Sequence, residues 1–139
     1  MAAEYRARIV HPYQRLVVWQ RAHQLAVSLY EAAALDESQR YRSLVDQIRR
    51  CAASISANIA EGAGSSSQTS FARYLGIALG SAHELENHFL LARDIGCASG
   101  AKSEGYLASI ESIKRMLTAL QRTVKTPKRP REKADGGPL

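Results

Sequence analysis

Apolar side chains recur at intervals of three and four residues along four long segments, which is the spacing of one helix face. Short polar connections between consecutive helices force neighbouring helices to run antiparallel. The pattern therefore predicts an all-α protein, an up-down-up-down antiparallel four-helix bundle. The first two expected helices are 16–34 and a helix from a cap at Asp36 or Ser38 to about 61, with Gly62 and Gly64 as stops. The third runs from a cap at Ser67 or Thr69 to about 95, with Gly96 as its stop, and the fourth from about 103 to Pro127.

The bundle is expected to occupy residues 14–124 of the 139-residue chain, a length that suits one domain. Residues 1–13 precede it as a basic N-terminal extension. Residues 125–139 contain three prolines and almost no apolar side chain that a core could bury. Because proline cannot continue a helix, this segment is predicted to be a disordered basic tail.

The first helix has an apolar arc nearly twice as wide as the ~100° stripe of an ordinary surface helix. One strip of this arc consists of Leu16, Trp19, His23, Val27 and Tyr30, and a second strip lies beside it. We expect the helix to bury its second side against another copy of the chain. Two glycines four residues apart in the third helix indicate either a close approach by a neighbour or glycine that is merely tolerated at an exposed position. The predicted interface residues of the homo-oligomer are Val18, Ala22, Leu25, Leu29, Gly76 and Gly80.

Polar residues form a stripe beside the core stripe on the second helix and again on the third. In an antiparallel hairpin, Gln47 is expected opposite Glu84, and Cys51 opposite Ser81. We interpret the stripes as a buried polar network that fixes the register of the helices, with a ligand or catalytic site as the alternative. The predicted network contains Gln47, Ser54, Asn58, Glu61, Ser81 and Glu84.

The formal net charge of +6 is concentrated at the chain ends: residues 1–15 carry +2, residues 125–139 carry +3, and residues 16–124 carry +1. The tail is either a solubilising end or an electrostatic arm for phosphates, because exposed cations gain affinity by releasing condensed counterions. The candidate nucleic-acid contacts are Arg49, Arg50, Arg73, Lys114, Arg115, Arg122, Lys125, Lys128, Arg129, Arg131 and Lys133.

No pattern for catalysis, metal binding or cofactor binding emerges from the sequence. Glu84 and His88 are four residues apart, and no second matching pair completes a di-metal site. Cys51 lies in mid-helix, and the glycines near residue 62 lack the strand and lysine of a phosphate-binding loop. Without a secretory signal, a disulfide framework or an apolar run of ~20 residues, a cytoplasmic protein with no membrane contact is predicted.

Several strings of the sequence resemble the signature of bacterial four-helix-bundle proteins found in 23S rRNA intervening sequences. These strings are LVVWQRA at 16–22, QIRR at 47–50, SISANIAEG at 54–62, FARYLGIALGS at 71–81 and ELE at 84–86. That family in turn resembles the accessory variability determinant of diversity-generating retroelements, a basic pentameric barrel that associates with reverse transcriptase and nucleic acid. The resemblance implies a homopentamer of four-helix bundles.

Two hypotheses for function follow from these observations. The first is a non-enzymatic homo-oligomer that binds RNA or DNA weakly through basic termini and a basic rim. The alternative is a protein-interaction scaffold without nucleic-acid binding, with a protein such as a reverse transcriptase as the partner that the resemblance implies. An enzymatic site would need Asn58, Glu61 and Glu84 as its centre, and we do not expect one.

Overall fold

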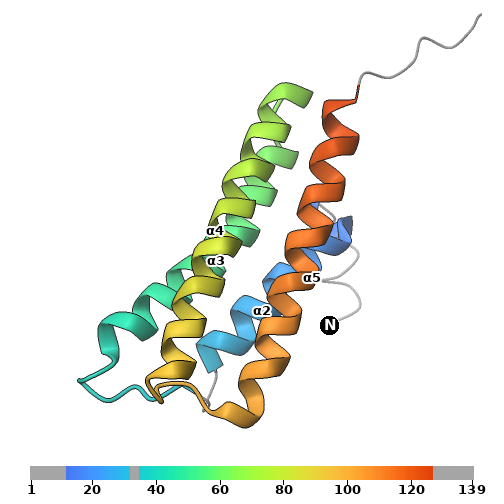
Figure 1. The fold of residues 1–139 in the computed structure, drawn as a ribbon. Coiled ribbons are helices and arrows are strands. Elements are labelled where there is room, and N and C mark those ends of the chain that lie inside the picture. Colours follow the sequence, from blue (N-terminus) through green and yellow to red (C-terminus); the bar gives the residue numbers. More distant parts are fainter. Residues whose placement is uncertain (1–11, 32–34, 127–139) are drawn as a thin grey trace, which may run out of the picture.

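The computed structural model describes residues 12–31 and 35–126, and these contain four α-helices and no β-strand (Figure 1). A single isolated antiparallel bridge joins Leu35 to Ala98. The all-α prediction is confirmed for this part of the chain, whereas nearly all of the predicted extension and the tail beyond residue 126 lie outside it. The elements are η1 (Pro12–Arg15), α2 (Val17–Glu31), α3 (Arg42–Ala63), α4 (Gln68–Asp94) and α5 (Gly100–Lys125).

Capping residues set two of the helix ends where the sequence placed them. Ser67 precedes α4, and its hydroxyl accepts a hydrogen bond from the backbone N–H of Ser70 at 3.1 Å. Gly96 follows α4 with φ of +80°, a conformation that glycine adopts without strain. The prediction for α3 was wrong: Asp36 accepts from the N–H of Ser38 at 2.9 Å and so stabilises a turn ahead of the helix. This backbone hydrogen bond lowers the pKa of Asp36.

The strip of α2 that was predicted to contact another copy lies inside the monomer. Leu25 is 5% exposed and Leu29 is fully buried, and both belong to the hydrophobic core with Val18 and Ala22. That interface prediction is therefore wrong for all four residues. The outer strip is the other one, because Val27 remains 42% exposed and its neighbours on that side are also accessible. Periodicity revealed two apolar strips but carried no information on which of them faces the core.

The helices differ greatly in length, and this opens one end of the bundle. α2 has 15 residues and extends about 22 Å, whereas α4 has 27 residues and extends about 40 Å. In Figure 1, α2 lies beside the lower half of α5 and stops short of the upper end. The upper end is formed by the last turns of α3, the first turns of α4 and the last turns of α5. We call this region, residues 58–76 and 118–126, the three-helix end.

Gly62 lies where α3 and α4 cross closely. A Cβ atom at this position would lie 2.7 Å from the Cβ of Tyr74 and 3.4 Å from the carbonyl oxygen of Phe71. Gly62 was predicted to stop the helix, but it lies within α3 and is needed for space. A Cβ atom at Gly76 would lie 3.0 Å from the amide nitrogen of Gln121 in the same chain, and one at Gly80 would have nothing within 4 Å. Of these two glycines of α4, only Gly76 is closely approached within the monomer.

Gly62→Ala is expected to destabilise the protein by about 1–3 kcal/mol, because the new methyl group has to push α3 and α4 apart. The matched control is Gly80→Ala, which adds the same methyl group in open space and is expected to stabilise its helix by up to ~1 kcal/mol. Urea unfolding monitored by circular dichroism measures both effects. A Gly62→Ala protein as stable as the wild type would contradict the tight crossing.

Candidate nucleic-acid interface

The centre of the predicted polar network forms along the seam between α3 and α4. The hydroxyl oxygens of Ser54 and Ser81 are 2.9 Å apart, and Ser81 is only 9% exposed. The Asn58 amide nitrogen donates to the backbone oxygen of Ser54 at 2.8 Å and to its hydroxyl at 3.0 Å. These three residues therefore form a connected set of hydrogen bonds, and the Ser54–Ser81 contact joins α3 to α4.

The outer members of the predicted network are exposed, so their predicted burial was wrong. Glu84 accepts from the Cys51 thiol, with Sγ and Oε2 3.7 Å apart, and Glu61 accepts from the Tyr74 hydroxyl at 3.3 Å. Both carboxylates face solvent, as does Gln47. Burial and the neighbouring Glu84 carboxylate raise the pKa of Cys51. The thiol therefore stays protonated and is a poor nucleophile.

The register of the hairpin differs from the predicted one by about one helical turn. Glu84 lies opposite Cys51 and Ser81 lies opposite Ser54, whereas the spacing of the polar stripes predicted Gln47 and Cys51 as their partners. The physical reason is at the hairpin turn. The chain reverses at residues 64–67, and Gly62, near the end of α3, lies close to Phe71 and Tyr74. Pairing with α3 therefore begins about one turn into α4.

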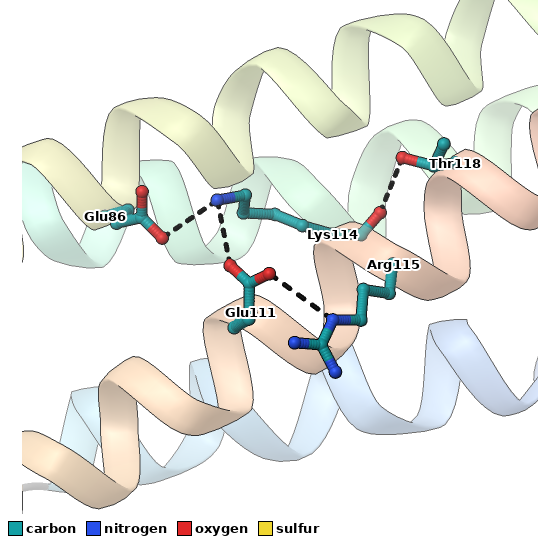
Figure 2. Close-up of polar contacts among 5 residues, drawn as sticks. All are labelled: Glu86, Glu111, Lys114, Arg115 and Thr118. Carbon is teal, nitrogen blue, oxygen red and sulfur yellow. Dashed lines mark hydrogen bonds and ion pairs between the residues drawn. The ribbon is translucent and has the colours of Figure 1, made fainter.

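Three of the predicted nucleic-acid cations are held in ion pairs inside the monomer. Lys114 lies between two carboxylates, with its Nζ 2.9 Å from Glu86 Oε2 and 3.1 Å from Glu111 Oε2 (Figure 2). Glu111 also pairs with Arg115 at 3.4 Å. The hydrogen bond to Glu86 raises the pKa of Lys114, and Lys114 in turn lowers the pKa of Glu111. This cluster joins α4 to α5 and balances its own charge.

Arg49 is likewise committed to the fold. Its Nε donates to the backbone oxygen of Leu29 at 3.1 Å, and its guanidinium pairs with Glu37. The same guanidinium lies 5.8 Å from the centre of the Tyr30 ring. Arg49 therefore fastens α3 to the end of α2, and together with Lys114 and Arg115 it is a poor candidate for phosphate binding.

The remaining candidates within the described residues, Arg50, Arg73, Arg122 and Lys125, form no ion pair with another described residue and are exposed. Arg73, in the second turn of α4, and Arg122 and Lys125, in the last turns of α5, lie together at the three-helix end. Arg50 is separate, in the first half of α3. The four tail candidates, Lys128, Arg129, Arg131 and Lys133, lie outside the described residues.

Acidic residues are confined to the opposite half of the α4–α5 hairpin. The carboxylates of the two helices are Glu84, Glu86, Asp94, Glu104 and Glu111. From Gly62 to His83 and from Ser112 to Arg131 the sequence contains no acidic residue. At the three-helix end the acidic residue is Glu61, which already accepts from Tyr74. The hairpin is thus acidic at one end and basic at the other, although residues 16–124 are nearly neutral as a whole.

The net charge of residues 16–124 concealed this segregation of acidic and basic residues. Residues 16–124 carry a net charge of only +1, because their acidic and basic regions nearly cancel. The two acid-free runs are visible in the sequence, but they become one surface only because the antiparallel pairing of α4 and α5 brings them together. That pairing is seen in the hydrogen bond from the Gln121 amide nitrogen to the backbone oxygen of Ala72, at 3.0 Å.

An open groove of about 860 Å³ lies between α4 and α5 at the three-helix end. Phe71 and Val124 are half-buried and form apolar parts of its wall, because α2 does not extend far enough to cover them. Arg73 and Lys125 also line the groove. The Arg73 guanidinium lies 5.2 Å from the centre of the Tyr74 ring. The groove therefore combines apolar walls with two cations, Arg73 and Lys125, that form no ion pair with another described residue.

Other kinds of site are not found in the part of the chain that the structure describes. Residues 12–31 and 35–126 contain no group of three or more His, Cys, Asp and Glu side chains arranged to hold a metal ion. None of the helices formed by these residues is both long and apolar enough to span a membrane. Cys51 and Cys97 are both free thiols in buried positions.

The comparisons with known proteins identify relatives but no activity. A crystal structure of a protein of unknown function from the S23 ribosomal protein family of Bacteroides thetaiotaomicron is 27% identical to this chain. It superposes with a TM-score of 0.71, and the match covers 79% of this chain and all of that one. No curated protein matches the sequence. The profile of the family described as 23S rRNA-intervening sequence protein matches residues 14–119, and this chain therefore belongs to that family.

Proposed function

We propose that the protein is a non-enzymatic, cytoplasmic nucleic-acid-binding protein, an up-down-up-down bundle that binds RNA or single-stranded DNA through its three-helix end and its basic tail. The segregation of charge along α4 and α5 carries this proposal. Cations that already pair with carboxylates have little to gain from a phosphate, whereas Arg73, Arg122 and Lys125 are free to exchange counterions for phosphates.

The position of the tail supports the same surface. Thr126, the last described residue, lines the groove at the three-helix end. The next seven residues of the sequence include Lys128, Arg129, Arg131 and Lys133. These cations are therefore tethered within a few residues of the free cations of α4 and α5. A polyanion that contacts one set is held at high effective concentration near the other.

Self-association is a second part of the proposal, and it uses the outer strip of α2. Val27 and Tyr30 are 42% and 54% exposed, and Trp19 stacks on His23 with ring centres 4.8 Å apart. An apolar strip of this kind is a typical subunit contact. A pentamer, which the resemblance to the retroelement accessory proteins implies, would carry five tails on one particle and multiply a weak affinity.

A protein-interaction scaffold is the alternative function, and one observation favours it. Three large apolar side chains, those of Ile77 and Leu91 on α4 and of Ile95 directly after it, are 42–49% exposed. They share the face of α4 that carries Glu84 and offer a contact surface away from the basic end. The association with a reverse transcriptase stays a prediction of the resemblance.

The proposed function is tested by truncating the chain after Thr126 and titrating both proteins with a labelled single-stranded oligonucleotide at several salt concentrations. The truncated protein is expected to keep its helicity and oligomeric mass, because α5 ends at Lys125. It should bind more weakly, and the slope of log K against log salt should be shallower by about 2 to 4, at roughly 0.7 to 0.9 for each lost phosphate contact.

Two results would count against this function. If both proteins bind with equal affinity and an equal slope of log K against log salt, the tail is not part of the interface. Only the three-helix end would then remain as the binding surface. No binding by the full-length protein at low salt would reject nucleic-acid binding and favour the scaffold.

A further inference from the structure

We propose that the groove between α4 and α5 at the three-helix end binds an unpaired nucleobase, so that the protein selects single-stranded nucleic acid over duplexes. This inference rests on the proposed function and specifies its ligand. The residues that line the groove include Thr69, Phe71, Arg73, Gln121, Val124 and Lys125.

The shape of the groove follows from the missing cover at this end of the bundle. Phe71 and Val124 pack against the core on one side and remain partly accessible on the other. The hydrogen bond from Gln121 to the backbone oxygen of Ala72 holds α5 against α4 beneath them. Because these walls are fixed by helix packing, the groove exists before any ligand binds.

The charge around the groove selects the chemistry of its occupant. Arg73 on α4 and Lys125 on α5 line the groove, and neither forms an ion pair with another described residue. Arg122 lies one turn before Lys125 and lines the neighbouring pocket, which also contains Lys114 and Arg115. An apolar wall with free cations at its rim fits a ligand that is flat and apolar at one point and anionic on either side. A nucleotide within a single strand has this form, with a base between two phosphates.

A duplex does not fit the same surface. Its bases are stacked and paired inside the helix, and a protein surface meets mainly phosphates and groove edges. The Phe71 ring contributes to binding only if a base is unpaired and can stack on the ring. A guanidinium such as that of Arg73 also stacks on bases, and it is already held close to the Tyr74 ring.

The experiment uses the full-length protein and three probes: a labelled oligo-uridine 12-mer, a mixed-sequence single-stranded DNA 12-mer and a DNA duplex with the same number of phosphates. Single strands are expected to bind at least tenfold more tightly than the duplex. Phe71→Leu keeps an apolar side chain but removes the ring, and it should weaken single-strand binding by about tenfold with no change in duplex binding. The salt slope should stay unchanged, because no charge is removed.

Phe71 lies near Gly62, so Phe71→Leu is checked for folding by thermal melting. Thr69→Leu is a second variant, at an exposed position that lines the groove, and its added bulk should give the same selective loss. Ser109→Leu is the matched control, since it adds similar bulk in a different groove, between α2 and α5. It should bind all three probes like the wild type.

The possible outcomes separate this inference from the function on which it rests. Equal binding of single strands and duplex, with wild-type affinity in Phe71→Leu and Thr69→Leu, would overturn the base-binding groove and leave nucleic-acid binding intact. No binding of any probe would reject the proposed function itself. If the two groove variants change only the oligomeric mass, the occupant is a second copy of the chain and the inference is wrong.

Discussion

Leu25→Asp is expected to prevent the monomer from folding. Leu25 lies in the hydrophobic core and is only 5% exposed. The substitution removes a packed apolar side chain and places a carboxylate in an almost wholly buried position of α2. Such changes cost several kcal/mol, which is comparable with the whole stability of a domain of this size. Circular dichroism at 20 °C should show the loss of most of the helical signal.

Val27→Asp is the matched control for this substitution, two residues along the same helix. Val27 is 42% exposed, so the new carboxylate stays in water and the monomer should keep its helices. If the outer strip of α2 is the contact between copies, light scattering should show a fall from the oligomeric mass toward 15.2 kDa. If the Leu25→Asp protein folds and the Val27→Asp protein does not, α2 buries the opposite face from the one that carries Leu25.

The helices themselves were predictable because their local signals agree. Apolar periodicity, Ser67 as a cap and Gly96 as a stop all indicate the bounds of α4 that the structure shows. α3 begins at Arg42, later than expected, because the Asp36 carboxylate accepts from the N–H of Ser38 and forms a turn instead of capping a helix. A cap residue and a turn residue look alike in sequence, and only the competition between them decides which hydrogen bond forms.

Two features of the candidate site depend on tertiary contacts and could not be obtained from periodicity. The register of α3 against α4 is set by the crossing at Gly62, which places Ser54 rather than Cys51 opposite Ser81. The status of each cation depends on which carboxylates the fold brings near it. Lys114 and Arg122 look equivalent in sequence, but Lys114 has two carboxylate partners whereas Arg122 faces solvent.

The second large effect is expected when the free cations of the three-helix end are neutralised together. Arg73→Gln, Arg122→Gln and Lys125→Gln remove three positive charges from one surface without touching an ion pair of the described residues. If each cation contacts one phosphate, the slope of log K against log salt should become shallower by about 2 to 3. A loss of about 1 kcal/mol per contact corresponds to an affinity more than a hundredfold weaker at physiological salt.

We propose that the position of the cations, and not the net charge of the protein, makes the three-helix end a nucleic-acid interface. The most direct measurement compares that triple variant with a control triple variant, Arg42→Gln, Arg50→Gln and Lys102→Gln, which removes three exposed cations elsewhere on the molecule. Both proteins lose the same charge and are titrated with the same single-stranded oligonucleotide over the same salt series. We predict a strong loss of affinity and a shallower slope for the first variant and near wild-type binding for the control. Equal losses in the two variants would contradict the claim.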